Sequence, residues 1–552
     1  MINEIIFSEK HEYSVELHGQ NKKLLGSGTL KFGAGNFISV NISGFDSFPI
    51  PEGEPNIQAI TASGDIFTLI NCEIEDLTIY ADLLISGEIE LGVSSIIIRY
   101  ADISEWFLHD QRIEGNVGES LNWSNAPPPI DATVQTDREQ FKISSEVSSF
   151  IINNRVEERV LVEYVNFIFS KDKALFDFSE VREKPHHLAC LFSILIAAPI
   201  TITCIWVTGA KRNWLPTYFS AFERPKKEFE RNRFWRNSLI RREMLDLHWP
   251  GILNSYFNSK HRESIWVRLA GMQRYQGFWE YKVLGYVSLL DSYATSITKL
   301  NNIKPTSNKL ATIESIIQQI ENLNTLVSSE GVAAIRAILN CALPKPRKEL
   351  HFQEKYEYII LNTDANILKT INLSNEEFIL LKKVRDTIAH GDAVDLEVYP
   401  HEKIFSITSK ITLLLTFRAL HEFGILAEDF MRSLYNTSNV LRYTKGLDIT
   451  HLERFLNPTS FFAVSQDLFE KISKFKSERI NACFTLSENG EIHYSEKYVT
   501  LFKKWNSTHP RENKSVVDFF GVEANLVTHI EKMRVEFDGQ TKELIHAWLI
   551  RV

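Results

Sequence analysis

The first 180 residues alternate short runs of β-branched or aromatic residues with Gly, Asn and Asp, which is typical of antiparallel strands. A break of composition N-W-S-N-A-P-P-P at residues 122–129 predicts a loop between two groups of strands. The runs are Gly26–Phe32, Phe37–Ile42, Asp65–Ile70, Ala81–Gly87, Ser95–Tyr100, Gln140–Ser144 and Val160–Phe167. We predict a β-rich domain, a sandwich or a barrel, and a sensing or regulatory role for it, because no catalytic constellation appears in this half.

Residues Leu188–Val207 contain no charged side chain and are numerous enough to cross a bilayer. Pro199 interrupts the run, and the residues after it are β-branched and partly alternating. We therefore predict a buried helix from about Pro185 to Ala198, followed by a buried strand. The alternative is a membrane span, which would make the protein a membrane-associated receptor.

From about Ile252 the apolar residues recur at helical spacing. Helices are predicted at Phe278–Ile297, Leu310–Leu326, Gly331–Leu339, Phe352–Leu361, Ser374–Gly391 and Glu402–Leu426. Further on we expect a helix at Ser465–Phe475, a hairpin turn at Asn489–Gly490 and helices that close the chain. The predicted fold is an α+β multidomain chain: a β-rich domain at 1–245, a helical domain at 246–430 and a mixed, mainly helical extension at 431–552.

One of these helices, Ser374–Gly391, has clear start and stop signals. Ser374 and Glu377 form a predicted capping box, and Gly391 stands where a left-handed C-terminal cap is expected. The last turns carry Arg385 and His390 with four residues between them, and Asp386 follows the arginine.

These residue types suit RNA cleavage. The guanidinium matches phosphate oxygens, and the imidazole can give and take protons near neutral pH. No metal is required in such a site, because the ribose 2′-hydroxyl can attack the adjacent phosphate once a base removes its proton. Residues five apart lie about 140° apart around a helix, so a second copy of the chain is one way to complete the site.

A second Arg and His at this spacing, Arg182 and His187, enclose Pro185 and precede the predicted buried helix. We expect no equivalent site there. Asp291 lies near the middle of the helix predicted at Phe278–Ile297, and is either part of the site or an ordinary solvated or packing residue.

The capped helix, with its R-x4-H spacing and long helices on both sides, resembles the motif helix of HEPN domains, many of which are metal-independent ribonucleases. The resemblance covers about Glu280–Leu426. Polar residues are usual in HEPN domains at the position of Asp386, and many carry an acidic residue where Asp291 stands. The β-rich half joined to such a bundle is similar in texture and length to the ApeA-type abortive-infection proteins, which defend bacteria against phage.

This resemblance implies catalysis by Arg385, His390 and Asp386, 2′,3′-cyclic phosphate products and no cofactor or metal. It also implies an RNA substrate from host or phage, with transfer RNA as a candidate, a phage protein as activator and pairing of HEPN bundles in a homodimer. The alternative is a catalytically silent module that dimerises and binds RNA or protein.

Residues 211–242 are basic, although the whole chain has a net charge of −9. Aromatic residues are interleaved with the cations, so the segment could hold RNA phosphates and stack bases. The alternative is a solvated helix that uses its aromatic residues to dock between domains, and this would account equally well for the mixture of cations and aromatic residues. The candidate RNA contacts are Lys211, Arg212, Arg231, Arg233, Arg236, Arg241 and Arg242.

The five cysteines are scattered without metal-ligand spacing, and the first residues show no secretory signal. We therefore expect reduced thiols, a cytoplasmic location and no membrane partner.

Overall fold

The computed structural model describes residues 4–19, 22–44, 56–89, 92–116, 120–155, 158–172, 174–209, 213–223, 234–305, 315–316, 318–319, 328–342, 349–457, 460–475, 478, 482–507 and 515–552. The chain forms two compact units, one of residues 1–364 and 373–445 and one of residues 365–372 and 446–552. The predicted division at residues 245 and 430 stays a prediction, since only separate fragments can show which parts fold alone.

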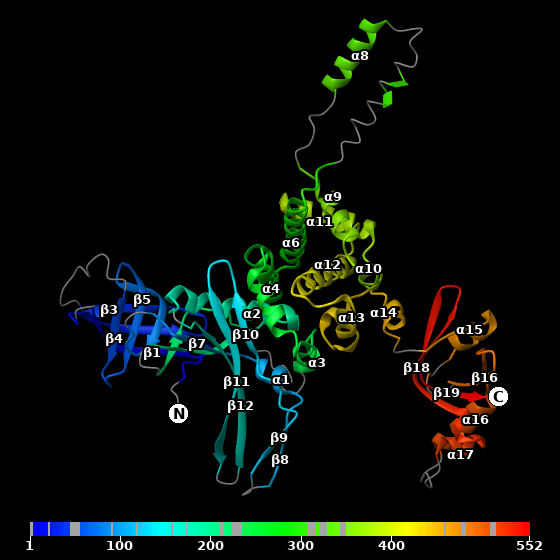
Figure 1. Cartoon of the computed structure of the whole chain (residues 1–552), viewed down its shortest axis with the longest axis horizontal. Coiled ribbons are helices and arrows are strands. Elements are labelled where there is room, and N and C mark those ends of the chain that lie inside the picture. Colours follow the sequence, from blue (N-terminus) through cyan, green and yellow to red (C-terminus); the bar gives the residue numbers. More distant parts are fainter. Residues whose placement is uncertain are drawn as a thin grey trace. The chain divides into compact units, whose positions relative to one another are not determined.

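The N-terminal strands close into a six-stranded antiparallel barrel (Figure 1). Its order is β6-β3-β2-β1-β4-β5, and the pairing of β5 with β6 completes the ring. The apolar side chains of alternate positions fill the interior, among them Leu30, Val40 and Ile79, which are fully buried. The strands are β1 (Lys10–His18), β2 (Leu24–Gly33), β3 (Asn36–Gly44), β4 (Asn56–Thr61), β5 (Ile66–Glu75) and β6 (Thr78–Ser86).

The same sheet continues from β6 into six more strands, in the order β14-β13-β7-β12-β11-β10. These strands are β14 (Trp214–Tyr218), β13 (Ile202–Thr208), β7 (Ser95–Tyr100), β12 (Glu158–Ser170), β11 (Gln140–Arg155) and β10 (Asp131–Gln135). The short helix α1 (Ile103–Leu108) and the ribbon of β8 (Arg112–Glu114) and β9 (Asn122–Ser124) lie between β7 and β10 in sequence. The predicted β-rich N-terminal domain is confirmed, as a barrel that extends into a sheet.

The uncharged run at Leu188–Val207 forms the C-terminal half of helix α2 (Phe178–Ile196) and then β13, as predicted. The helix begins earlier than expected, because Asp177 and Glu180 form a capping box. Pro185 lies inside α2, where its carbonyl accepts a hydrogen bond of 2.8 Å from the Tyr100 hydroxyl. Within the described part of the chain, no helix has the length and apolar character needed to cross a bilayer.

The rest of the first unit is helical, and α6 packs against α9, α11 and α12. The predicted helix Leu310–Leu326 falls mostly outside the described residues, and the other predicted helices are present. The elements are α3 (Phe234–Asn237), η1 (Arg242–Leu245), α4 (Trp249–Asn258), η2 (Arg262–Trp266), α5 (Val267–Arg274), α6 (Trp279–Leu300), α8 (Ser329–Ala342), α9 (Phe352–Leu361), α11 (Asn375–Ala389), α12 (His401–Glu422), α13 (Ala427–Asn436) and η3 (Val440–Tyr443).

The second unit is built around a five-stranded sheet of order β15-β18-β19-β16-β17. The predicted hairpin at Asn489–Gly490 joins β16 to β17, and α15 is the predicted helix. The expectation that helices close the chain was wrong, because β18 and β19 end it. The elements are α10 (Ala365–Ile371), α14 (Ile449–Leu456), β15 (Ser460–Ala463), α15 (Gln466–Ser473), β16 (Cys483–Leu486), β17 (Ile492–Tyr494), α16 (Glu496–Ser507), α17 (Val516–Phe520), η4 (Ala524–Leu526), β18 (Val527–Phe537) and β19 (Gln540–Arg551).

Candidate active site

Helix α11 begins and ends at the residues that its sequence predicts. The Ser374 hydroxyl accepts a hydrogen bond of 3.2 Å from the Glu377 N–H, and the Glu377 carboxylate accepts one of 3.0 Å from the Ser374 N–H. At the other end Gly391 has a φ of 81°, and its N–H donates to the Ile388 carbonyl. The Asp392 N–H donates to the Thr387 carbonyl, and this hydrogen bond completes a Schellman cap. His390 is therefore held directly before the turn that stops the helix.

One face of α11 is anchored in the bundle. Phe378, Leu381 and Val384 are fully buried, and the Tyr356 ring of α9 stacks on Phe378 with ring centroids 3.7 Å apart. On the same side Lys410 of α12 forms an ion pair of 2.9 Å with the capping residue Glu377. A helix packed against three neighbours presents its C-terminal residues in a fixed orientation.

Arg385 lies between two carboxylates at this end of the helix. Its Nη2 donates to Oδ2 of Asp291 on α6 at 3.2 Å, and its Nη1 lies 3.1 Å from Oδ1 of Asp386. The guanidinium also stands over the Phe352 ring of α9, 5.3 Å from its centroid. The side chain keeps 20% of its surface exposed, so a phosphate could still reach it.

Asp291 is shared with a second cation. Nζ of Lys355 on α9 lies 3.5 Å from Oδ1 of Asp291 and donates to the Thr295 hydroxyl at 2.8 Å. Two carboxylates thus face two cations, and the cluster is balanced in charge. Because each carboxylate holds Arg385 from a different direction, the plane of the guanidinium is fixed before any ligand arrives.

His390 is exposed at the end of α11. Among the residues that the structure describes, no hydrogen bond or ion pair joins its side chain to Arg385. A single chain therefore presents a fixed arginine and a free histidine at the same helix end, but not one combined site.

The second Arg–His pair at the same spacing is used differently. Arg182 and His187 lie within α2, not before a helix as expected, and Arg182 pairs with Asp82 at 3.3 Å. His187 is buried beside Glu263, and burial lowers its pKa to about 4. A neutral, enclosed imidazole of this kind serves packing within the fold, in contrast to the exposed His390.

The predicted RNA contacts are only partly described. Lys211, Arg212, Arg231 and Arg233 lie outside the described residues. Arg236 is exposed and Arg241 is partly buried, and both guanidiniums stand over the Trp235 ring, 5.1 and 5.4 Å from its centroid.

Arg242 has another environment and only 5% of its surface exposed. It pairs with Asp246 at 3.1 Å and donates to the Pro128 carbonyl at 2.8 Å. This cation is used within the fold and has no surface for RNA, so we correct the expectation for Arg242. Arg236 and Arg241 stay predicted RNA contacts.

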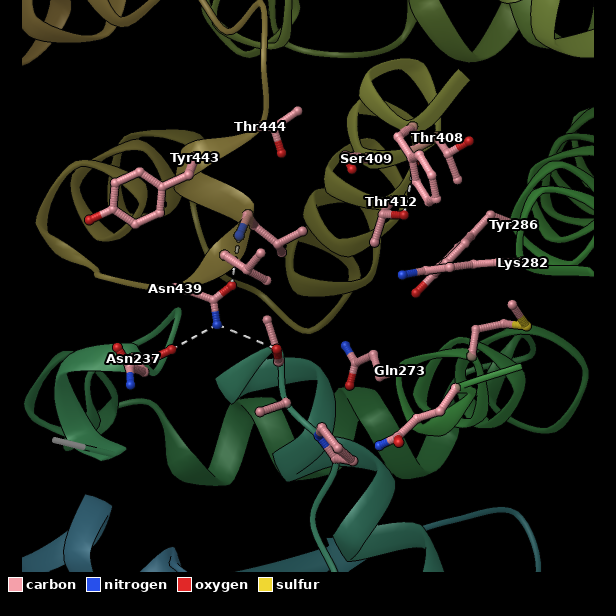
Figure 2. Close-up of a pocket in the computed structure, with 18 of the residues that line it drawn as sticks. Asn237, Gln273, Lys282, Tyr286, Thr408, Ser409, Thr412, Asn439, Tyr443 and Thr444 are labelled. Carbon is pink, nitrogen blue, oxygen red and sulfur yellow. Dashed lines mark hydrogen bonds between the residues drawn. The ribbon is translucent and has the colours of Figure 1, made fainter. Parts of the chain in front are cut away.

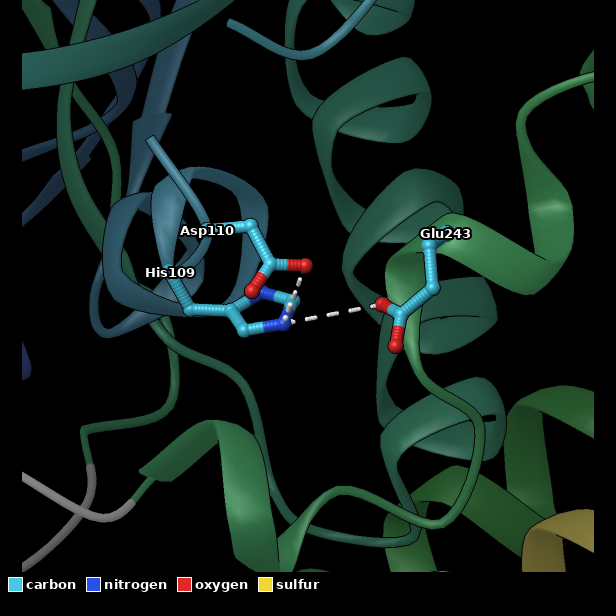
Figure 3. A group of neighbouring side chains, drawn as sticks. All are labelled: His109, Asp110 and Glu243. Carbon is cyan, nitrogen blue, oxygen red and sulfur yellow. Dashed lines mark ion pairs between the residues drawn. The ribbon is translucent and has the colours of Figure 1, made fainter. Parts of the chain in front are cut away.

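A group of possible metal ligands lies beside this segment (Figure 3). Nε2 of His109 lies 3.1 Å from Asp110 and 3.6 Å from Glu243, while its Nδ1 faces the Trp106 carbonyl at 3.2 Å. Arg241 stands 4.0 Å from Glu243 and supplies positive charge to the group. Since a protein cation already neutralises this carboxylate and both carboxylates are exposed, the group is as well suited to an ion-pair cluster as to a metal.

Sequence reasoning left the role of Asp291 open and missed Lys355 entirely. Apolar spacing places Asp291 on a helix, but it does not tell which neighbouring helix that position faces. The segment Phe352–Leu361 was predicted to be a helix, but its pattern does not indicate which residue Lys355 contacts. A search for opposite charges on helices flanking the motif helix could have proposed both residues.

Comparison with known proteins bears on the N-terminal half. The model of the family described as ApeA N-terminal domain 1 matches residues 13–256. The match spans the barrel, the extended sheet and most of α4, and it ends before α6 and α11. No curated protein and no solved structure matches the chain.

Proposed function

We propose that the chain, whose residues 13–256 match the family model of ApeA N-terminal domain 1, is a metal-independent HEPN endoribonuclease of the ApeA-type anti-phage family, acting in abortive infection. In this proposal it works in the cytoplasm and cleaves host or phage RNA, with transfer RNA among the candidates. A phage component triggers it through the N-terminal domain. The observation that supports the chemistry best is the arginine fixed between Asp291 and Asp386 at the helix end that exposes His390.

Each residue has a separate task in the proposed reaction. His390 transfers a proton at the ribose 2′-hydroxyl or the leaving oxygen, and Arg385 binds the scissile phosphate and stabilises the charge that develops on it. Asp386 orients the guanidinium through the contact to Nη1. The 2′-oxygen attacks phosphorus and the bond to the 5′-oxygen breaks. The products are a 2′,3′-cyclic phosphate and a 5′-hydroxyl.

The proposed active form is a homodimer. His390 is exposed while Arg385 is turned toward α6, and among the described residues no hydrogen bond or ion pair joins the two side chains of one chain. A two-fold axis near the end of α11 would bring the histidine of each copy to the arginine of the other. This pairing requires α11 to be exposed at its C-terminal end, as it is at residues 389–391.

The test is RNA cleavage in EDTA by the purified protein, with a phage lysate as activator and with the product ends mapped. We expect wild-type protein to give cyclic phosphate ends and His390→Ala to give none. His493→Ala, which removes an exposed histidine of the second unit, is the matched control and should cleave normally. Cleavage that persists in His390→Ala would refute this site.

A catalytically silent module is the second candidate, and one observation favours it. Nη1 and Nη2 of Arg385 are already occupied by carboxylates, as in an arginine with only a structural role. This candidate predicts that wild type and His390→Ala both fail to cleave while both still dimerise and bind RNA. It also predicts that Arg385→Ala leaves phage defence intact.

A further inference from the structure

A cavity of about 620 Å³ lies in the first unit, and neither Arg385 nor His390 is among the residues that line it (Figure 2). Its walls come from the C-terminal end of α2, from α3, α5, α6 and α12, and from η3. The volume is in the range that proteins use for small organic ligands. Residues that follow α2 and residues of the helical bundle thus line one cavity that opens to solvent.

The charge of the lining is positive. Lys282 of α6 is partly buried and its side chain points into the cavity (Figure 2). Among the residues that the structure describes, no ion pair engages this lysine, and no carboxylate belongs to the described lining. A partly buried cation without a counter-ion favours a negatively charged ligand.

The polar wall opposite Lys282 has one unused acceptor. Oε1 of Gln273 on α5 is buried and accepts no hydrogen bond from any described residue. Asn439, by contrast, is fully engaged: its Nδ2 donates to the Asn237 carbonyl at 2.7 Å and its Oδ1 accepts from the Leu441 N–H. A ligand that brings an N–H donor to Gln273 would satisfy this acceptor once the buried amide turns toward the cavity.

The rim of the cavity is apolar and exposed. Phe405, Val440 and Tyr443 keep 38%, 75% and 69% of their surfaces exposed. Flat aromatic faces at an entrance suit a planar ring, because stacking covers both surfaces at once.

We propose that this cavity binds a small organic anion with a planar, hydrogen-bonding ring, the chemistry of a nucleoside monophosphate. The anion pairs with Lys282, an N–H of the base (a ring N–H or an exocyclic amino group) donates to Gln273, and the ring covers the apolar rim. Binding does not depend on the proposed nuclease function. The site is placed to influence it, however, since α6 carries Lys282 into the cavity and Asp291 to Arg385.

The experiment is calorimetric titration of the full-length protein with AMP, GMP, CMP and UMP, and with the four matching nucleosides and inorganic phosphate as partial ligands. At least one monophosphate should bind with a dissociation constant below about 1 mM. Its nucleoside and free phosphate should each bind at least about tenfold more weakly. Lys282→Gln should weaken binding of the monophosphate by a similar factor. The control is Lys299→Gln, at the exposed end of the same helix, which should leave the dissociation constant unchanged.

Each other outcome overturns the proposal or a part of it. If none of the four monophosphates binds, or if Lys282→Gln and Lys299→Gln bind equally, the site is refuted. Phosphate that binds as tightly as a monophosphate would remove the role of the ring, and nucleoside that does so would remove the role of the charge. If Lys282→Gln fails to fold, Ser409→Trp, which fills the cavity from α12, should abolish binding instead.

Discussion

Arg385 of α11 and Asp291 of α6 face each other in the helical bundle, with Nη2 and Oδ2 3.2 Å apart. The two residues are far apart in sequence and meet only because α6 packs against α11. The contact makes Asp291 a positioning residue for the arginine. It also links the first long helix of the bundle to the candidate active site.

Replacing Asp291 with Asn removes the charge but keeps an oxygen of the same size. We expect Asp291→Asn to lower kcat for RNA cleavage by roughly tenfold and to change KM little, because the guanidinium loses one of its two fixed contacts. Steady-state kinetics on a short RNA measure both constants. Glu280→Gln on the same helix is the control and should leave kcat unchanged. An unchanged kcat for Asp291→Asn would show that the Asp291 contact does not position Arg385.

Mixing two inactive variants tests whether the site is shared between copies. Arg385→Ala and His390→Ala should each be inactive, but their mixture should recover about a quarter of wild-type activity, since random pairing makes about half of the dimers mixed and each holds one complete site. Cleavage is measured after the two proteins are unfolded and refolded together. A mixture as inactive as its components would place both residues of a site in one chain.

Gly391 is expected to be required for its backbone conformation alone. Its φ is 81° and nothing stands within 4 Å of an added Cβ. Gly391→Ala should therefore lower the free energy of unfolding by about 1 kcal/mol through strain in the cap. Gly251→Ala makes the same change inside α4, also in open space, and should raise that free energy by about 0.5 kcal/mol. Urea titration measures both, and equal effects would contradict the argument.

Glu453 makes the second unit sensitive to acid. Its side chain is fully buried, and burial alone would raise its pKa, but hydrogen bonds from Arg534 and Lys532 outweigh burial and lower the pKa below its ordinary value of 4.5. The folded state thus prefers the charged carboxylate more than the unfolded chain does. This contribution to stability is complete above about pH 4.5 and is lost as the pH falls through the lowered pKa of the folded state.

The matching variant is Glu453→Gln, which should cost about 3 kcal/mol at pH 7 because Arg534 and Lys532 lose their buried counter-ion and keep only the partly exposed Glu543. The cost should shrink as the pH is lowered below 4.5. The loss of unfolding free energy is measured by urea titration, with unfolding of the second unit monitored through hydrogen exchange of peptides from β18 and β19. Glu531→Gln, an exposed change on β18, is the control. A cost that does not depend on pH would exclude the ion pairs as its source.

Local signals in the sequence predicted local structure well. The start of α11 follows from Ser374 and Glu377, and its end follows from Gly391, because caps involve only neighbouring residues. The same kind of signal was overlooked at the end of the chain. Asp538 and Gly539, both with positive φ, form the two-residue turn between β18 and β19, and an Asp-Gly pair is among the strongest hairpin signals.

Contacts between distant segments could not be predicted in this way. Nothing in the local pattern tells that β3 pairs with β6 in the barrel, or that Lys355 and Asp291 meet beside Arg385. Each of these contacts depends on which faces of two elements meet, and apolar periodicity gives only the face that is buried. The chemistry of Arg385 and His390 was visible for the opposite reason, since both belong to one helix.

Strand β6 serves two structures at once. One edge pairs with β5 along most of the strand, while the other pairs with β3 at residues 78–81 and with β14 at residues 84–85. Detaching β6 would open the barrel and separate it from the extended sheet in a single event. The N-terminal half should therefore unfold cooperatively, and a force applied to the barrel would be transmitted directly to the sheet that packs against α2.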